Sequence, residues 1–193
     1  MMFNQLMEAV RRELPFKRWE HTLGVMKSAK ELAHKYGADI DKAELAGLLH
    51  DYCKYWPTER QRLVILESNL PNELLSYDKP LWHAPVGAYV VSQEFGISDE
   101  EVLNAVRYHT SGRVGMTLLE KVVCLADYME PGRVYPEVEV IRSLAETSLE
   151  KALIAGFDST IHYLLTKGEK IYPLTLLSRN ALIDEVRDRR INR

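Results

Sequence analysis

Cysteine is scarce in this sequence. The 193 residues contain only Cys53 and Cys124, whose separation matches no zinc-binding spacing. Two isolated cysteines in a chain of this size are not typical of a disulfide framework, and they indicate a reduced, cytoplasmic protein. We expect both side chains to behave as small buried hydrophobic groups.

Long apolar runs and a basic surface are lacking as well. No stretch of about 18 consecutive apolar residues occurs, so we expect no transmembrane helix and no membrane partner. The amphipathic first twelve residues lack the basic start and apolar core of a secretory signal. The net charge of −3 argues against a nucleic-acid partner, because no basic stripe is available to contact phosphates.

Internal repeats and low-complexity linkers are also missing. Hydrophobic residues make up 46% of the chain and charged residues 27%, as in an ordinary globular protein. A length of 193 residues is enough for one good hydrophobic core. We therefore expect a single compact domain over residues 1–193.

Helical periodicity dominates the sequence, and no strand pattern competes with it. Residues 17–36 carry an apolar side and end before a glycine, and residues 40–51 are apolar almost all round, which is typical of a buried helix. Further helices are expected over 57–67, 85–95, 98–109, 117–129, 147–166 and 174–190. Those at 98 and 147 begin with the capping boxes Ser98–Glu101 and Thr147–Glu150. The predicted fold class is an all-α helical bundle.

Polar side chains interrupt this pattern where the sequence otherwise builds core. The clearest case is His50-Asp51, which closes the nearly unbroken apolar stretch 43–51. Burying an unpaired polar group costs roughly 2–7 kcal/mol, and a charge costs more. A bound metal cation removes that cost, because it takes neutral imidazole nitrogen and anionic oxygen as ligands.

More such side chains lie at helix ends or inside apolar runs: His21, His83, His109 and Asp127. One buried histidine or aspartate is more often a capping or hydrogen-bonding residue than a ligand, but here the coincidence recurs along the chain. Four imidazoles and two carboxylates suit iron, manganese, zinc or similar ions. The other two histidines fall outside this set, His34 on a solvated face and His162 in a structural role.

The ordered set His21, His50-Asp51 and Asp127 resembles the H…HD…D pattern of the HD-domain metal-dependent phosphohydrolases. Five longer motifs in order are similar to the YqeK family, which comprises bacterial symmetrical dinucleoside-tetraphosphate hydrolases. These motifs are Arg18–Val25, Leu49–Lys54, His83–Gly87, Arg107–Gly112 and Leu125–Arg133. The resemblance spans about residues 14–190. It implies a single HD-type domain whose core covers about residues 17–130 and whose C-terminal helices complete the nucleotide pocket.

The resemblance implies four metal ligands: His21, His50, Asp51 and Asp127. The ion it points to is iron, divalent or trivalent, with manganese, cobalt, nickel or zinc as alternatives. His83 and His109 match histidines that superfamily members use to bind a second ion or the substrate phosphate. In the second case the imidazolium would donate a hydrogen bond to the phosphate. The resemblance further implies that four residues are catalytic: Asp51, Asp127, His83 and His109.

Eight residues are implied to contact nucleotide: Arg18, His21, Lys54, His83, His109, Thr110, Asp127 and Arg133. The three cations Arg18, Lys54 and Arg133 would compensate the charge of a tetraphosphate chain in an acidic protein, or else pair with neighbouring carboxylates. Thr110 begins a polar turn that either donates to phosphate or only stops a helix. A further stretch, 170–173, is expected near the nucleotide.

The activity implied by the resemblance is metal-dependent hydrolysis of diadenosine tetraphosphate, and of related dinucleoside polyphosphates, to two ADP. One alternative keeps the site as a nucleotidase or (p)ppGpp hydrolase, because a fold does not fix the substrate. Another is a non-catalytic nucleotide-binding regulator, which intact residues at all six positions disfavour. Base preference and assembly as a homodimer stay open.

Overall fold

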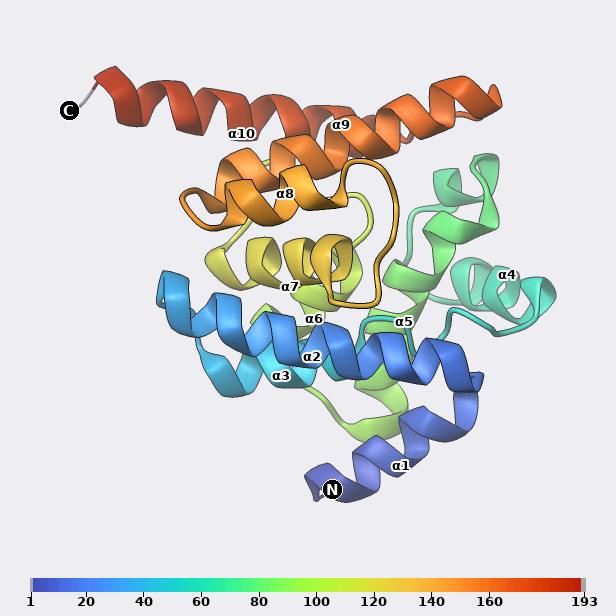
Figure 1. Ribbon diagram of the computed structural model, residues 1–193. Coiled ribbons are helices and arrows are strands. Elements are labelled where there is room, and N and C mark those ends of the chain that lie inside the picture. The colour runs from blue at the N-terminus through green and yellow to red at the C-terminus, as the bar shows by residue number, and fades with distance from the viewer. Residues whose placement is uncertain (1, 192–193) are drawn as a thin grey trace.

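The structure, a computed structural model, describes residues 2–191, which form helices joined by short loops (Figure 1). The elements are α1 (Phe3–Glu13), α2 (Phe16–Tyr36), α3 (Ile40–Leu49), α4 (Thr58–Glu67), the 3-10 helix η1 (Asn72–Ser76), α5 (Lys79–Phe95), α6 (Glu100–Tyr108), α7 (Leu118–Met129), α8 (Val138–Ala145), α9 (Leu149–Lys167) and α10 (Pro173–Ile191). No strand occurs in this range, and the all-α prediction is confirmed. None of the helices within it is long and apolar enough to cross a lipid bilayer.

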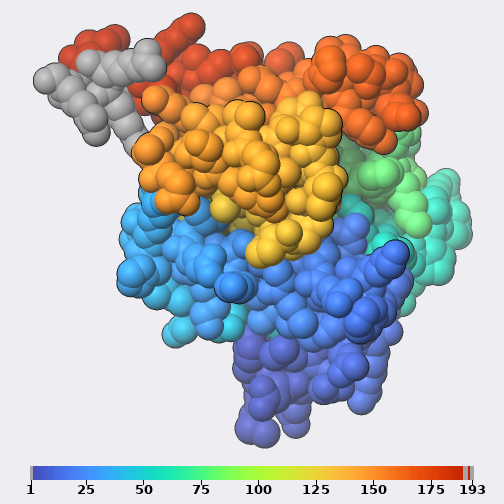
Figure 2. All heavy atoms as spheres, in the orientation of Figure 1, coloured from blue at the N-terminus to red at the C-terminus, as the bar shows by residue number. Residues whose placement is uncertain are grey.

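Helix α7 lies between two layers of helices. On one side it packs against α2 and α6, and α3 packs against both of these helices. On the other side α8 and α9 cover it, and α10 lies along α9 (Figure 1). Figure 2 shows the same order on the surface, with α9 and α10 at one end of the molecule and α1 at the other. Because α7 touches both layers, its polar residues can take part in a site between them.

The contact between α2 and α3 is unusually close. Gly47 faces α2 where a Cβ atom would lie 3.1 Å from the Cα atom of Met26. The residues around it, Ala46 and Leu48, have no exposed surface. The lack of a side chain at Gly47 therefore sets the separation of the two helices that carry His21 and His50.

Helix α5 begins six residues earlier than the sequence predicted. Pro80 lies in its first turn, where a proline needs no hydrogen-bond partner for its nitrogen, and Pro85, the predicted start, lies inside the helix. Residues 82–88 are all buried, so packing overrides the preference of Pro85 for a helix start. His83 is consequently inside a helix, and its predicted position ahead of one is wrong.

The two predicted capping boxes are also wrong by one residue. Asp99, not Ser98, caps α6, and its carboxylate accepts hydrogen bonds from two backbone N–H groups at 2.9 and 3.3 Å. Ser148, not Thr147, caps α9, and its hydroxyl accepts from the backbone of Lys151 at 3.3 Å. Adjacent capping residues compete for the same role, and the sequence does not rank them.

The other predicted helices agree with the structure to within two residues at each end. The sequence did not assign α1, α8 or η1. Helix α1 is the amphipathic N-terminal stretch, which buries Leu6 and Val10. Helix α8 spans eight residues and buries Val138, Ile141 and Ala145. Such short elements depend on packing more than on local propensity.

Gly112 offers a test of how the C-terminal helices close on the rest. Its φ is +61°, and a Cβ atom would lie 2.8 Å from both Phe157 Cζ and Ser178 Oγ. We predict that Gly112→Ala lowers the free energy of unfolding by about 2–4 kcal/mol, because overlap with α9 and α10 adds to backbone strain. Chemical denaturation measures this loss.

Gly115→Ala is the matched control. Gly115 has φ +70°, and nothing lies within 4 Å of the position that a Cβ atom would take. The free energy of unfolding of this variant should fall by only about 1–2 kcal/mol, which is the cost of the backbone strain. Equal losses in the two variants would contradict the packing role of Gly112.

Candidate metal centre

Six polar side chains converge where α2, α3, α5, α6 and α7 meet. They are His21 in α2, His50 and Asp51 at the end of α3, His83 in α5, His109 at the end of α6 and Asp127 in α7. All except Asp127 are at most 9% exposed. Asp127 is 20% exposed and is the most accessible member of the cluster.

The Asp51 carboxylate lies at the centre of the cluster. Its Oδ2 atom is 3.3 Å from His50 Nε2 and 3.7 Å from His21 Nε2. Its Oδ1 atom is 3.0 Å from His83 Nε2 and 3.8 Å from His109 Nε2. One carboxylate thus bridges two pairs of histidines.

Asp127 closes the cluster on the side of α7, with Oδ1 3.0 Å from His21 Nε2. Two groups of ligand atoms, each within 4.8 Å of one another, result: His21, His50 and Asp127, and His50, Asp51 and His109. The structure therefore brings together all six residues that the sequence singled out, including the four implied metal ligands.

Hydrogen bonds fix the orientation of three of the imidazoles. In each, Nδ1 donates to an oxygen: His21 to Glu130 Oε1 (3.0 Å), His50 to the Gly47 carbonyl (2.7 Å) and His109 to the Val106 carbonyl (2.8 Å). These oxygens only accept, so Nδ1 of each of these rings carries a proton and donates it. Nε2 then faces the cluster, and in the neutral ring this atom carries the lone pair that metal-binding histidines use.

The opposed nitrogens fit a cation. His21 Nε2 and His50 Nε2 are 3.4 Å apart, and His83 Nε2 and His109 Nε2 are 3.1 Å apart. In each pair one nitrogen donates to the other only while it carries a proton, and a cation bound by both nitrogens takes the place of that proton. Neutral imidazoles with carboxylates form a donor set suited to a divalent transition-metal ion.

Burial sets the protonation state of the second histidine pair. Burial lowers the pKa of His109 well below its usual value, and the charge of His50 lowers it further. Burial also lowers the pKa of His83, and the Lys54 ammonium adds to this shift. Both rings are therefore neutral near pH 7, which favours the ligand role over the imidazolium donor that the sequence left open.

Both carboxylates stay ionised. Burial alone would raise the pKa of Asp51, but the charge and hydrogen bond of His50 outweigh it and hold this pKa well below the usual range. Burial likewise opposes the ionised form of Asp127, yet the Arg133 guanidinium beside it keeps its pKa low. The cluster thus offers two anionic oxygens to a cation at neutral pH.

The three predicted cations surround the cluster. Arg18 Nη1 donates to Asp51 Oδ2 at 2.9 Å, and Arg133 donates to Asp127. Lys54 Nζ lies 3.3 Å from His83 Nε2, and burial lowers the pKa of this lysine. All three cations therefore lie beside the cluster. Arg18 and Arg133 also pair with its carboxylates, so both expectations for these residues are met.

A cavity of about 670 Å³, the inner cavity, opens from the cluster toward α9. Five residues expected at the nucleotide line it: Lys54, His109, Thr110, Asp127 and Arg133. Arg18, His21 and His83 are not among its lining residues, and Arg18 contacts Asp51 instead. The volume falls in the range of sites for small molecules and cofactors.

Sequence reasoning missed part of this site. Glu130 accepts the hydrogen bond from His21 and is 3% exposed. The only sign of this role in the sequence was an acidic residue directly after the apolar run of α7. The far wall of the inner cavity comes from α9, with Thr160 and Tyr163. His162, expected in a structural role, is instead exposed and lines the inner cavity.

Several known proteins are similar to this chain in sequence. The HD domain family model matches residues 18–132. The chain belongs to the HD-domain family. It is 48% identical to "Bis(5'-nucleosyl)-tetraphosphatase, symmetrical" of Bacillus subtilis and 47% identical to the protein of the same name from Halalkalibacterium halodurans, each match covering 93% of this chain and 96% of the relative. The resemblance to the YqeK family is thereby confirmed.

A solved structure shares the fold of this HD-domain chain. It is described as a "predicted HD superfamily hydrolase involved in NAD metabolism" from Clostridium acetobutylicum. It superposes with a TM-score of 0.91 at 37% identity and covers 96% of this chain and 98% of its own. The family and the His/Asp cluster together indicate a site for a divalent metal ion.

Glu130 should control metal affinity through His21. We predict that Glu130→Gln weakens metal binding about tenfold or more, because a neutral amide makes the imidazole a poorer ligand. Equilibrium dialysis against a metal buffer measures the affinity. Glu146→Gln is the control, since Glu146 is 74% exposed and pairs with Lys35. A lower melting temperature with unchanged metal affinity would contradict this role.

Proposed function

We propose that this HD-domain protein is a metal-dependent symmetrical bis(5'-nucleosyl)-tetraphosphatase that hydrolyses diadenosine tetraphosphate to two ADP. Two relatives of that name match 93% of the chain at 47–48% identity. The observation that carries the proposal is the six-residue cluster opening into the inner cavity, with Lys54 and Arg133 on the cavity wall. Positive side chains beside a metal site suit a chain of phosphates.

The ion we propose is iron, held by His21, His50, Asp51 and Asp127. The Nε2 lone pairs and the ionised carboxylates support this ligand set, which manganese, cobalt, nickel and zinc also accept. The opposed nitrogens of His83 and His109 support a second ion next to Asp51. When bound, the metal supplies a water activated for attack and countercharge for phosphate oxygens.

The chain's own residues orient the reactants. Lys54 and Arg133 bind oxygens of the two middle phosphates, and Arg18 holds the Asp51 carboxylate in place at 2.9 Å. The ionised Asp127, which reaches the inner cavity, accepts a hydrogen bond from the attacking water. The water oxygen bonds to one middle phosphorus while its proton passes to Asp127, the bridging P–O bond breaks, and the second ADP leaves with the bridging oxygen.

The C-terminal helices complete the nucleotide pocket in this proposal. The match to the HD domain family ends at residue 132, whereas α9 lines the inner cavity with Thr160 and Tyr163. The metal ligands thus come from the matched part, and the wall opposite them comes from the helices beyond it. Thr110 lines the cavity as well, which supports contact with the nucleotide.

Product analysis tests the substrate and the position of cleavage. We expect metal-loaded protein to convert diadenosine tetraphosphate into ADP as its sole nucleotide product, resolved by anion-exchange chromatography. Formation of AMP and ATP would contradict symmetrical cleavage. Release of phosphate from nucleoside monophosphates, or of pyrophosphate from (p)ppGpp, without turnover of the dinucleotide would favour the alternative hydrolases. Binding without turnover of any of these compounds would favour a regulator.

Asp51→Asn tests the site itself. It keeps the side-chain shape and removes the charge that bridges the histidines. Bound metal should fall below stoichiometric amounts, and kcat should drop at least about a thousandfold, while the helical circular dichroism stays unchanged. Asp41→Asn is the control, because Asp41 is exposed in the first turn of the same helix. Retained metal and activity in Asp51→Asn would show that the ligand assignment is wrong.

A further inference from the structure

A second cavity, the outer cavity, lies beyond the inner one. It measures about 490 Å³ and is lined by residues of the segment 77–81, of the C-terminal end of α9 and of the start of α10. In Figure 1 this end of α9 extends over the segment that leads from η1 into α5. Lys170 Nζ donates to the Ser76 carbonyl at 2.9 Å and ties the two sides together. None of the six cluster residues lines the outer cavity.

The two cavities are neighbours. Thr110, Thr160 and Tyr163 line both of them. The Thr110 hydroxyl is buried and makes no hydrogen bond within residues 2–191. A buried hydroxyl without a partner is costly, and a ligand that passes from one cavity to the other would supply the missing hydrogen bond. A dinucleoside polyphosphate has the extended shape that this arrangement requires.

The walls of the outer cavity suit a nucleoside better than a phosphate group. Tyr77 and Tyr172 form an edge-to-face pair with ring centroids 4.9 Å apart, and Tyr163, 59% exposed, adds a third ring. Aromatic side chains stack on nucleobases. Asp78 and Glu169 lie on the same wall together with Lys167 and Lys170, and the Asp78 carboxylate raises the pKa of Glu169. The two carboxylates can accept hydrogen bonds from ribose hydroxyls.

Symmetrical cleavage creates a need for such a second site. The bond that is broken follows the second phosphate from the nucleoside, and the same bond exists in adenosine 5'-tetraphosphate and in ATP. A metal site with one nucleoside pocket binds the reacting phosphates of all three compounds alike. Only contacts with the far nucleoside distinguish the dinucleotide from mononucleotides that the same chemistry would cleave.

We propose that the outer cavity binds the second nucleoside of the dinucleoside tetraphosphate, while the inner cavity binds the phosphates and the first nucleoside. This inference rests on the proposed function and names the residues that select a substrate with two nucleosides. Leu81, half-buried in the outer cavity wall and outside the six-residue cluster, is the position at which we introduce a larger side chain.

The test compares diadenosine tetraphosphate with adenosine 5'-tetraphosphate, which carries four phosphates but only one nucleoside. We expect kcat/KM of the wild-type protein for the dinucleotide to be at least about tenfold higher. Leu81→Trp should lower kcat/KM for the dinucleotide at least about tenfold, chiefly through KM, and should bring the two substrates close to parity. Glu169→Ala, an exposed substitution that does not endanger folding, should change the ratio in the same direction.

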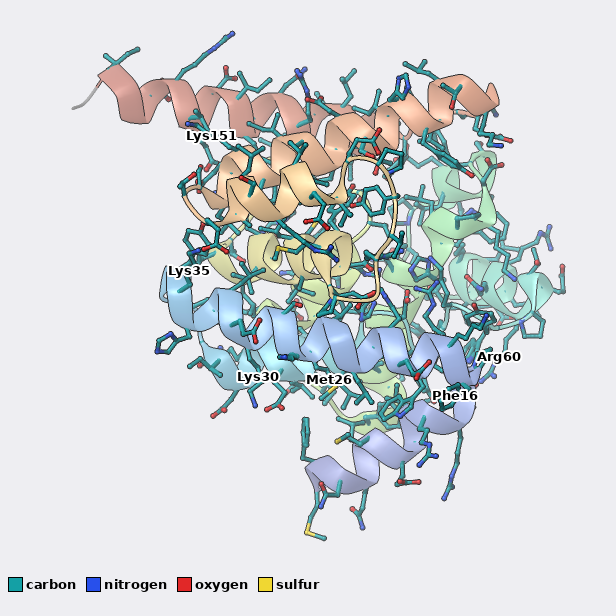
Figure 3. All side chains as sticks on the ribbon, viewed as in Figure 1. Phe16, Met26, Lys30, Lys35, Arg60 and Lys151 are labelled. Carbon is teal, nitrogen blue, oxygen red and sulfur yellow. The ribbon has the colours of Figure 1, made fainter. Side chains whose placement is uncertain are left out.

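Lys151→Glu is the matched control. Lys151 is an exposed lysine at the opposite end of α9 and lines neither cavity (Figure 3). It should leave the substrate ratio unchanged. Equal kcat/KM for both substrates in the wild type, or an unchanged ratio in both Leu81→Trp and Glu169→Ala, would overturn the inference. Absence of any turnover of the dinucleotide by wild-type protein would instead refute the proposed function.

Discussion

A carboxylate that is removed from water needs positive charge or hydrogen-bond donors around it. Asp51 is 2% exposed, and four imidazoles and the Arg18 guanidinium surround it. These partners come from four different helices, so the position of this one group constrains how α2, α3, α5 and α6 pack. The small residues at the α2–α3 contact, Gly47 above all, are what permit the approach. Fold and site therefore have a common physical origin.

The sequence predicts the helices and the cluster well because both leave local signals. Periodicity marks the helices, and the polar interruptions at His50-Asp51 and Asp127 mark the ligands. Packing decided where helix α5 begins, which local sequence preferences did not predict. Pro85 is tolerated inside α5 because the surrounding residues are buried, and this places His83 within a helix rather than ahead of it.

The cavity walls were the least predictable part of the site. Glu130 belongs to the site only because α7, which it caps, packs against α2 and brings it to His21, 109 residues away in sequence. The α9 residues Thr160 and Tyr163 are ordinary helix-surface residues until α9 lies opposite the cluster. A binding wall formed by long-range packing leaves no periodic signature. Sequence reasoning thus located the cluster and expected the C-terminal helices at the pocket, but it did not name the α9 residues of the cavity wall.

Because the proposed ligands come from α2, α7 and the end of α3, a bound ion would also act as a cross-link. An ion that binds only the folded chain shifts the folding equilibrium by mass action, by about 2.7 kcal/mol when its free concentration is one hundred times the dissociation constant. The supply of metal in the cell would then set the lifetime of this protein as well as its activity. Chains made during metal shortage would unfold and be degraded sooner than chains that hold the ion.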